Sequence, residues 1–250
     1  MAAKKDADVP SAAGIDLGLR ADMTSSSHAR IGATVVAFCL LAFASAARAQ
    51  EEVRGFAKNG LFVGATAVPD FAFDGVTFDG ASIYQQEGGD EILLLPRLEA
   101  KSTIRGVVGY RLTRGSFEFG YERIKHPATF MGLPGEATFT ALNFDERIYM
   151  FTRSRIQPFG LAGYSIPRLT VKDGSFLNDR VGDGSYHGQG VNLEAGVTAF
   201  PISRVGVSVG YRYRVMWFNR ATGVTDTEYE LHPRFRETAG NVSFTAFFTF

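Results

Sequence analysis

The chain has 250 residues, and its 26 Lys and Arg residues balance 26 Asp and Glu residues, so its formal net charge is zero. Hydrophobic residues make up 45% of the sequence and charged residues 21%, which disfavours both a disordered chain and a polybasic nucleic-acid binder. The single cysteine, Cys39, allows neither a disulfide framework nor a cysteine-based metal site.

The first predicted element is a secretory signal peptide. An apolar run spans residues 31–47 between Arg30 and Arg48, and Ala47 and Ala49 provide the small-x-small pattern of a cleavage site. The alternative is a membrane anchor, but a spanning helix needs about 20 strongly apolar residues and this run is short and rich in Ala and Ser. We therefore expect export and cleavage after Ala49.

The predicted signal peptide follows an unusually long polar preface. A second methionine, Met23, would start a signal peptide of ordinary size. We therefore expect residues 1–22 to be an untranslated or disordered upstream extension, 23–49 to be the signal peptide, and 50–250 to be one β-barrel domain.

The exported part of the chain contains repeated alternation of apolar and polar residues, which is typical of strands with two different faces. The clearest segment, 204–217, alternates Val, Tyr and Trp with Gly, Ser and Arg. In the fourth segment Glu146 falls on the apolar face, which requires a bulge or a strand end near the interface. In chain order the eight segments are 59–69, 103–112, 117–122, 138–151, 155–166, 191–199, 204–217 and 242–250.

The connections between these segments alternate in length. Three are short turns at 113–115, 152–154 and 201–203. The other four are long and lie at about 70–101, 125–136, 167–188 and 218–238. Short turns at one end and long loops at the other are typical of outer-membrane barrels. The sequence therefore predicts an all-β fold, an eight-stranded antiparallel up-and-down transmembrane β-barrel.

The apolar face points inward in a soluble barrel of the lipocalin kind and outward in a membrane barrel. The outward direction is favoured because the polar face is rich in Gly and small residues, and because only 6 of the 26 basic residues are Lys. The polar face also carries five Arg and four acids, which we expect to pair inside a narrow barrel. This predicted interior charge network consists of Arg105, Arg111, Glu118, Glu122, Asp145, Arg147, Glu194, Arg212 and Arg214.

Aromatic residues near the predicted strand ends indicate two interfacial girdles. The expected members are Phe117, Phe200 and Phe250 at the short-turn end and Tyr121, Tyr213 and Trp217 at the other end.

The C-terminal segment, 241–250, alternates polar and apolar residues and ends in Phe248-Thr249-Phe250. Gly-aromatic pairs recur at 109–110, 120–121, 163–164 and 210–211. In these features the chain resembles the small OmpA/OmpX-like barrels of the bacterial outer-membrane β-barrel superfamily. The resemblance implies a Gram-negative outer membrane and implies that the barrel-assembly machinery reads Phe248 and Phe250 as an assembly signal.

Candidate catalytic and metal-binding residues are few. A lipid A deacylase would need a His-x-Ser pair, but His126, His187 and His232 are followed two places on by Ala, Gln and Arg. Ser185 and Asp183 lie close to His187 in a Gly-rich stretch that we expect to be a solvated loop. We therefore expect no catalytic residue and no cofactor.

The first long loop is acidic, since Asp70, Asp74, Asp79, Glu87, Asp90 and Glu91 lie within 70–91 without Lys or Arg. A calcium site or a surface for a basic partner is one interpretation, and turn chemistry of the repeated Asp-Gly pairs is the other. The spacing does not match the EF-hand pattern, which favours turn chemistry and no metal site.

Two apolar runs indicate how the barrel acts at the surface. Residues 92–98 precede the second strand and 167–171 continue the fifth, so strands longer than the bilayer needs would project as a sheet edge open to a partner strand. The sequence thus predicts a structural, adhesion-like surface protein that contacts outer-membrane lipid, lipopolysaccharide and a surface protein. A narrow pore for small or apolar solutes is the alternative, and a lipid A-modifying enzyme is less favoured.

Overall fold

The computed structural model describes residues 55–74, 83–85, 92–130, 133–177, 180–222 and 228–250. The predicted upstream extension and signal peptide lie outside these residues. Within them the regular structure is all strand, and no helix is long and apolar enough to cross a membrane.

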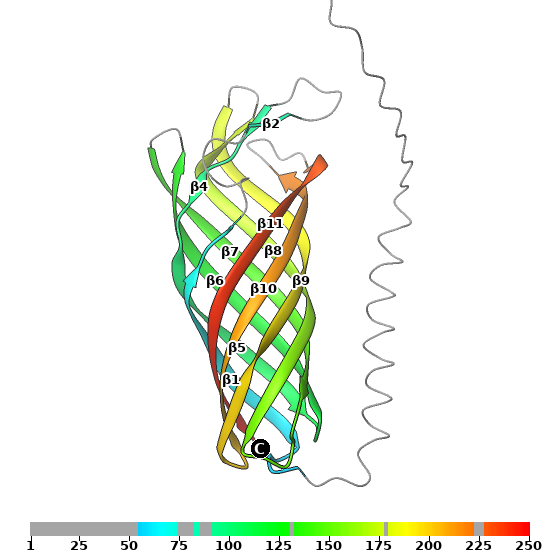
Figure 1. The fold of residues 1–250 in the computed structure, drawn as a ribbon. Helices are drawn as coiled ribbons and strands as arrows, with labels where there is room; N and C mark the ends of the chain where they lie inside the picture. The colour runs from blue at the N-terminus through cyan, green and yellow to red at the C-terminus, as the bar shows by residue number, and fades with distance from the viewer. Residues whose placement is uncertain (1–54, 75–82, 86–91, 131–132, 178–179, 223–227) are drawn as a thin grey trace, which may run out of the picture. The chain divides into compact units, whose positions relative to one another are not determined.

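Eight long antiparallel strands form a closed barrel (Figure 1). Each strand pairs with its neighbours in chain order, and β1 pairs with β11 to close the wall. The predicted eight-stranded antiparallel up-and-down barrel is therefore confirmed. The eight strands are β1 (Gly60–Phe71), β5 (Lys101–Arg111), β6 (Gly115–Phe130), β7 (Leu133–Tyr149), β8 (Ile156–Leu177), β9 (Arg180–Ile202), β10 (Val205–Thr222) and β11 (Glu228–Thr249).

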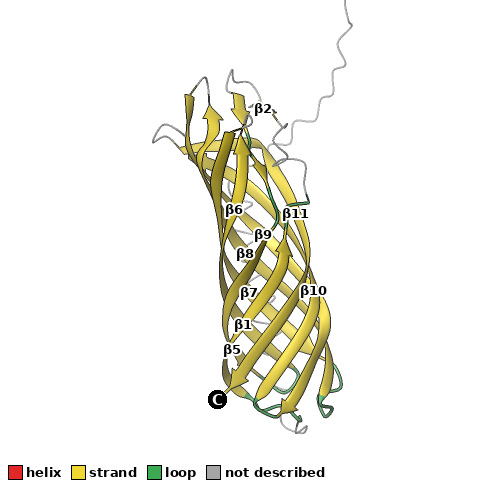
Figure 2. Cartoon of the chain, turned by 90° about the vertical axis from the view of Figure 1, so that its left-hand side faces the viewer, coloured by secondary structure: helices red, strands yellow, loops and turns green. Residues whose placement is uncertain are grey.

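The two ends of the barrel differ, as Figure 2 shows. The end that carries the C-terminus, here called the inner end, has three short turns, at 112–114, 150–155 and 203–204. At the opposite, outer end the hairpins are long, because only 131–132, 178–179 and 223–227 lie between the strands. The prediction of long loops at 125–136, 167–188 and 218–238 is thus wrong in its boundaries, since cross-strand pairing continues through most of these residues.

The connection between β1 and β5 contains three short strands, β2 (Ile83–Gln85), β3 (Ile92–Leu94) and β4 (Arg97–Leu98). Strand β3 pairs with the end of β8, and β4 pairs with β6 where β5 no longer does. The run 92–98 therefore does not extend the second barrel strand, whereas 167–171 continues β8 as expected. The predicted open edges are therefore paired within the chain, since 167–171 lies between β7 and β9 and the first loop covers the ends of β6 and β8.

The seam between β1 and β11 is short. Its six paired positions end at Ala67 and Phe244, whereas β10 and β11 pair along most of their lengths. The Leu61 carbonyl accepts a hydrogen bond from Phe250 N–H. The backbone N–H and C=O groups of the odd-numbered residues of β1 therefore point toward β11. Pro69 is the next residue of this set beyond Ala67, and proline has no N–H to continue the ladder. The seam ends there.

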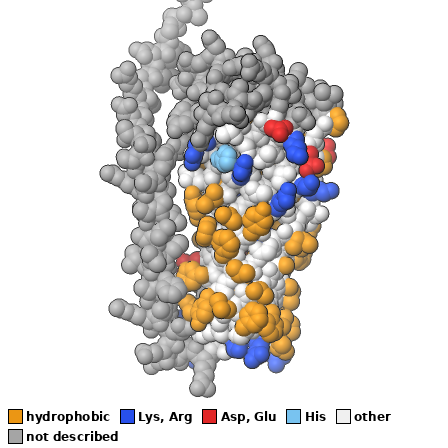
Figure 3. All heavy atoms as spheres, turned by 180° about the vertical axis from the view of Figure 1, so that it is seen from behind, with side chains coloured by type: hydrophobic (Ala, Val, Ile, Leu, Met, Phe, Trp, Pro, Cys, Tyr) orange, Lys and Arg blue, Asp and Glu red, His pale blue; other side chains and the backbone are white. Residues whose placement is uncertain are grey.

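Side chains alternate between the two faces of the wall. Outward-facing positions in the middle of the strands form an apolar belt, visible in Figure 3 as orange side chains. Glu146 also faces outward, without a register shift, and lies three residues from the inner end of β7. Of the two explanations predicted for it, the strand end is the one observed. The belt includes Leu61, Val63, Ile104, Val108, Phe119, Phe144, Leu193, Val207, Val209, Tyr211, Phe244 and Phe248.

The predicted aromatic girdles are found in part. Tyr121, Tyr213 and Phe250 are exposed on the outside of the wall. Phe117 and Trp217 face outward but are half-buried. The assignment of Phe200 is wrong, because its side chain lies inside the barrel with 1% of its surface exposed. Phe200 has the same parity as Glu194 and Thr198 in β9, so the alternation that places those polar residues inside also places this ring there.

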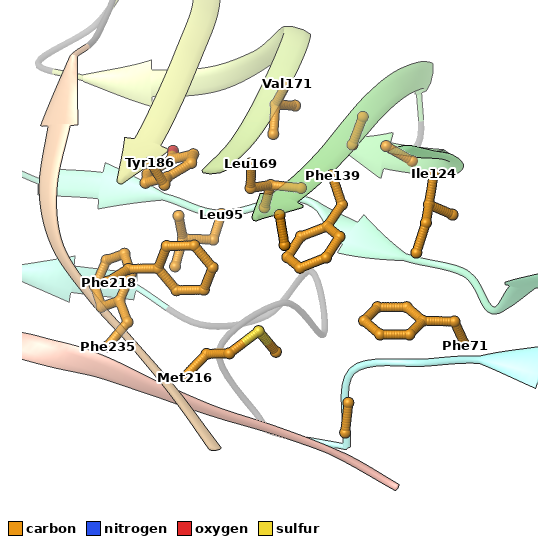
Figure 4. Packing of buried hydrophobic residues seen from close by; sticks show 14 of the residues in the cluster. Phe71, Leu95, Ile124, Phe139, Leu169, Val171, Tyr186, Met216, Phe218 and Phe235 are labelled. Carbon is orange, nitrogen blue, oxygen red and sulfur yellow. The ribbon is translucent and has the colours of Figure 1, made fainter. Parts of the chain in front are cut away.

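The barrel interior has three levels. An aromatic level at the inner end joins Phe62, Phe247, Phe200, Tyr149 and Phe159 through ring contacts of 5.3 to 6.4 Å. Charged and polar side chains occupy the middle. The level nearest the outer end, here called the outer core, is apolar and is shown in Figure 4. Its larger members are Phe71, Leu95, Ile124, Phe139, Leu169, Tyr186, Met216, Phe218 and Phe235.

Candidate functional site: the barrel interior

The middle level of the interior is an ion network with Asp145 at its centre. Arg212 Nη2 lies 2.9 Å from Asp145 Oδ2, and Arg105 Nη1 lies 3.5 Å from the same oxygen. The other carboxylate oxygen, Oδ1, accepts a hydrogen bond of 3.0 Å from Asn192. Three strands besides β7 thus supply donors to one carboxylate, which holds the two sides of the barrel together across the lumen.

Arg212 also reaches a second acid. Its Nε donates to Glu194 Oε2 at 2.7 Å, and Glu194 Oε1 accepts from the hydroxyl of Ser243 at 3.0 Å. The side chains of Arg212, Glu194 and Asp145 expose at most 2% of their surface. A guanidinium presents five donors in a planar fork, so one Arg can satisfy two carboxylates in this way.

Two further pairs complete the network. Arg147 contacts both oxygens of Glu118, at 2.8 Å from Nε and 3.2 Å from Nη2, and Ser116 donates to the same carboxylate. Arg214 forms a bidentate pair with Glu122. The four predicted acids and four of the five predicted arginines therefore meet as ion pairs in the lumen.

Arg111 is the exception, because it forms none of the ion pairs found among the described residues. Its Nη2 donates to Gln157 Oε1 at 2.8 Å. Its guanidinium carbon lies 3.8 Å from the ring centre of Tyr149 and 4.5 Å from that of Phe200. Stacking between two aromatic faces stabilises a cation that is removed from water. Arg111 therefore joins the charged middle level to the aromatic inner level.

Glycines create the space that this interior needs. A Cβ atom at Gly163 would collide with Asp145 Oδ1, and one at Gly206 would collide with the Phe247 ring. One at Gly109 would lie 2.6 Å from the Phe62 ring. At these positions glycine permits close contacts between the wall and inward-facing charged and aromatic groups.

Of the three histidines considered as catalytic candidates, His126 faces inward and is buried. Its Nδ1 donates to the Glu99 carbonyl at 2.7 Å, and its ring lies against Phe71 and Phe73. Burial is the largest influence on its pKa and lowers it, while the Glu99 hydrogen bond and Glu122 act in the opposite direction. His126 therefore contributes to holding the first loop.

The stretch around His187 is not the solvated loop that we expected, because it belongs to β9. His187 pairs with Arg168 and Arg220 on the neighbouring strands. The hydroxyl of Ser185 accepts from Arg168 Nε at 3.1 Å and forms a second hydrogen bond with Thr170. The Ser185 hydroxyl is thus engaged by strand β8. His232 also lies on a strand, β11.

The acidic first loop, 70–91, is described at 70–74 and 83–85. Asp70 and Asp74 are exposed, and Asp74 Oδ2 accepts a hydrogen bond of 2.8 Å from Gly240 N–H. The other predicted acids, Asp79, Glu87, Asp90 and Glu91, lie outside the described residues. Within the described residues no group of three or more possible ligand side chains is placed to hold a metal ion.

The predicted assembly signal lies at the inner end. Phe248 and Phe250 face outward, with ring centres 5.3 Å apart in an edge-to-face arrangement. The backbone of Phe250 is hydrogen-bonded to Leu61 on β1. The cleavage-site residues Ala47 and Ala49 lie outside the described residues.

The sequence interpretation missed the apolar outer core and its contact with the first loop. Met216 and Phe218 have the same parity as Arg212 and Arg214 in β10, so alternation alone places them inside. This alternation was the signal in the sequence from which the outer core could have been predicted. The contribution of Leu95 had no such signal, because it comes from a loop.

The family of this fold follows from comparison with known proteins. A family model described as outer membrane protein beta-barrel domain matches residues 35–247. The chain belongs to this family. No curated protein matches the chain.

Solved structures of small barrels resemble this member of the outer-membrane β-barrel family. Neisserial surface protein A is 16% identical, with a TM-score of 0.49, and the match covers 76% of this chain and 97% of that one. Outer membrane protein OprG from Pseudomonas aeruginosa is 15% identical, with a TM-score of 0.40 and coverage of 78% and 98%. The N-terminal β-barrel domain of OprF from the same organism is 12% identical, with a TM-score of 0.37 and coverage of 76% and 100%.

Membership of this family places the barrel in the bacterial outer membrane, so the apolar belt contacts lipid. Short turns face the periplasm in such barrels and long connections face outward. The inner end, with its C-terminal Phe250, is therefore periplasmic, and the outer core lies on the extracellular side.

Proposed function

We propose that this outer-membrane barrel is a non-catalytic structural and surface-interaction protein, which displays a rigid extracellular extension to lipopolysaccharide and to proteins of other surfaces. The observation that carries the proposal is the outer core. A barrel that only spanned the bilayer would need about 9–11 residues per strand. Here β6 continues through residues 122–130 and β7 begins at 133, nine residues before Leu142 of the belt.

The part of the barrel beyond the apolar belt, here called the extension, is suited to contact with partners. Nine residues of strand add about 30 Å along the strand direction. Apolar side chains such as Phe139 and Phe218 are fully buried within this part, so it is packed like a small domain and not left as mobile loops. Its first loop adds β3 and β4 to otherwise unpaired strand edges. Such a rigid surface supports contact with partners because little order must be gained on binding.

The packing of the interior favours this role over a pore, the alternative. Arg147, Arg212, Phe139 and Phe200 represent all three levels, and each exposes 1% or less of its surface. Eight strands leave an interior just wide enough for side chains. Ion pairs buried in this way resist the passage of water and solutes, because opening a path would leave charges unpaired.

Two kinds of measurement test the proposal, one on the purified protein and one on cells. The folded protein is inserted into planar lipid bilayers, where we expect no steady channel, and cells with and without the protein are compared in surface-adhesion and outer-membrane-barrier assays. A matched variant replaces residues 173–182 with the two-residue turn Asn-Gly. This change removes the end of the β8–β9 hairpin and keeps the register of the two strands up to Lys172.

We expect the shortened variant to fold, to stay closed and to lose the adhesion or barrier effect. Folding is checked by the faster gel migration of an unheated barrel. Steady single-channel currents from the intact protein would contradict the proposal and support a pore. A change in lipid A mass that depends on the protein would instead support the enzyme reading.

A further inference from the structure

The outer wall of β6, β7 and β8 carries a patch of basic residues just above the apolar belt. Cross-strand register aligns outward-facing side chains in rows. The topmost belt row is Tyr121, Leu142 and Ile166, all exposed. The next row outward joins Arg123, Thr140 and Arg168. Two residues further lie Lys125, Thr138 and Thr170, and then Pro127, Glu136 and Lys172.

This basic patch, defined as Arg123, Lys125, Arg168 and Lys172, has a surplus of positive charge. All four side chains are exposed, and Glu136 is the acid that faces them from β7. Lys125 Nζ lies 3.0 Å from Glu136 Oε1, and this contact lowers the pKa of Glu136. With Glu136 paired, Arg123, Arg168 and Lys172 make none of the ion pairs found among the described residues.

The two arginines are oriented for a ligand on the wall. Arg168 donates through Nε to Ser185, which fixes its side chain against β9 and leaves its Nη groups for other acceptors. Arg123 and Arg168 flank Thr140 from the strands on either side, so their backbones lie about 10 Å apart. His187 and Arg220 continue the same row onto β9 and β10.

The position of the patch on the barrel defines the class of ligand. Figure 3 shows Lys and Arg side chains gathered above the apolar belt on the side that faces away from the viewer in Figure 1. A molecule bound there has anionic groups at the level of Arg123 and Arg168 and an apolar part along Leu142 and Ile166. Guanidinium groups bind phosphate through charge-assisted hydrogen bonds, with Arg suited to paired contacts.

We infer that the wall of β6–β8 is a binding site for the phosphorylated disaccharide of lipid A in the outer leaflet, with its acyl chains lying along the belt. Two phosphates on one headgroup match two arginines separated by a strand better than the single phosphate of a glycerophospholipid does. This inference rests on the extracellular orientation used in the proposed function and deepens it by naming the lipid partner.

The test measures binding of purified bisphosphorylated lipid A to the folded full barrel in detergent, by native mass spectrometry. The double variant Arg123→Gln with Arg168→Gln should bind lipid A about tenfold more weakly than the unaltered protein, because charge-assisted contacts to both phosphates are lost. Dephosphorylated lipid A should bind the two proteins equally. Added salt should weaken binding to the unaltered protein more than to the double variant.

Arg236→Gln is the matched control. Arg236 is also exposed, but it lies on β11, which is separated from β7 by three strands in either direction around the barrel. A second pair, Lys125→Gln with Lys172→Gln, tests the outer rows and should cause a smaller loss. All variants are first checked for heat-modifiable gel migration.

Three results would overturn the inference. They are unchanged affinity in the Arg123 and Arg168 double variant, an equal loss in Arg236→Gln, and equal competition by detergent-solubilised phosphatidylglycerol at the same phosphate concentration. The last result would indicate a general anionic lipid surface. None of these results concerns adhesion or conductance, so failure of the lipid site and failure of the proposed function are distinguishable.

Discussion

The carboxylate of Asp74 accepts a hydrogen bond from the backbone N–H of Gly240 at 2.8 Å, and the backbone N–H of Asp74 donates to Thr238. These two bonds fasten the start of the first loop to β11 beyond the point where β1 stops pairing with it. The loop thereby takes over the role of the missing strand.

Replacement of Asp74 by Ala should therefore loosen the first loop. One of the two bonds is lost, at a local cost of about 1 kcal/mol. Trypsin should then cleave more rapidly at the exposed residues Arg97, in β4, and Lys101, at the start of β5. Asp70→Ala is the matched control, because Asp70 is exposed and has no such bond to β11. Equal cleavage rates for both variants would show that the bond does not hold the loop.

Removal of Arg212 should be among the most destabilising single changes in the lumen. Arg212→Met leaves Glu194 and Asp145 buried without their shared cation, at a cost of about 3–5 kcal/mol. The measurement is the urea midpoint for unfolding from lipid vesicles. Arg147→Met removes the partner of only one acid and should lower the midpoint less. The reverse order would contradict the central place given to Arg212.

Gly163→Ala should disturb the network without changing any charge. The added methyl group would collide with the Asp145 carboxylate, and overpacking of this kind costs about 1–3 kcal/mol. Gly160→Ala on the same strand is the control, since nothing lies within 4 Å of a Cβ there. Thermal melting of both variants measures the difference. Equal melting temperatures would mean that the wall relaxes around Asp145.

Acidification should release the first loop through His126. Burial lowers the pKa of His126 from its ordinary value of 6.5, so the packed state favours the neutral ring and the released state takes up a proton at higher pH. The packing free energy from this group is therefore fully present above pH 6.5 and is lost as the pH falls below it.

Tryptic cleavage at Arg97, compared between pH 7.5 and pH 5.5 and corrected for the activity of the protease, measures this release. Cleavage should accelerate at the lower pH in the unaltered protein. His126→Phe keeps a ring against Phe71 and Phe73 without a titrating group, so its cleavage should not depend on pH. An unchanged pH dependence in the variant would assign the effect to another group.

Phe250→Ala tests the assembly signal suggested by the C-terminal sequence. The substitution keeps the backbone bond to Leu61 and removes an exposed ring, so refolding in detergent should be unaffected. In cells, less folded barrel should accumulate, if the machinery reads this residue. Phe244→Ala, which removes another exposed ring from the same face of β11, is the control. Equal accumulation in both would show that position 250 carries no special signal.

Alternation was sufficient to predict the wall of the barrel, because each strand must separate lipid from lumen at every second residue. It placed Arg105, Glu194 and Arg212 on one face, and the structure brings these residues together inside. Which acid pairs with which arginine depends on how far neighbouring strands are shifted along one another. No local sequence pattern determines that shift. The failure at Phe200 shows that parity outweighs residue type, since an aromatic ring can fill the lumen as well as face lipid.

The outer half of the molecule was harder to predict from the sequence. Residues such as Pro127 and Gly135 are turn formers, yet paired strands continue through them. Pairing there is maintained by the apolar outer core, to which Leu95 contributes from a segment far along the chain from Phe218. A contact of that kind has no periodicity to detect.

The short seam ended by Pro69 has a consequence for how the barrel forms. An interior side-chain hydrogen bond of the seam joins Thr66 to Thr245 across 179 positions, so closure brings together the two ends of nearly the whole domain. The entropic cost of closing such a long loop is large, and this seam offsets it with six paired positions, fewer than β10 and β11 form with each other. Neighbouring hairpins are local and form with little loss of chain freedom. We therefore expect β1 and β11 to be the last strands to join during membrane insertion, and their junction to be the first to separate on unfolding.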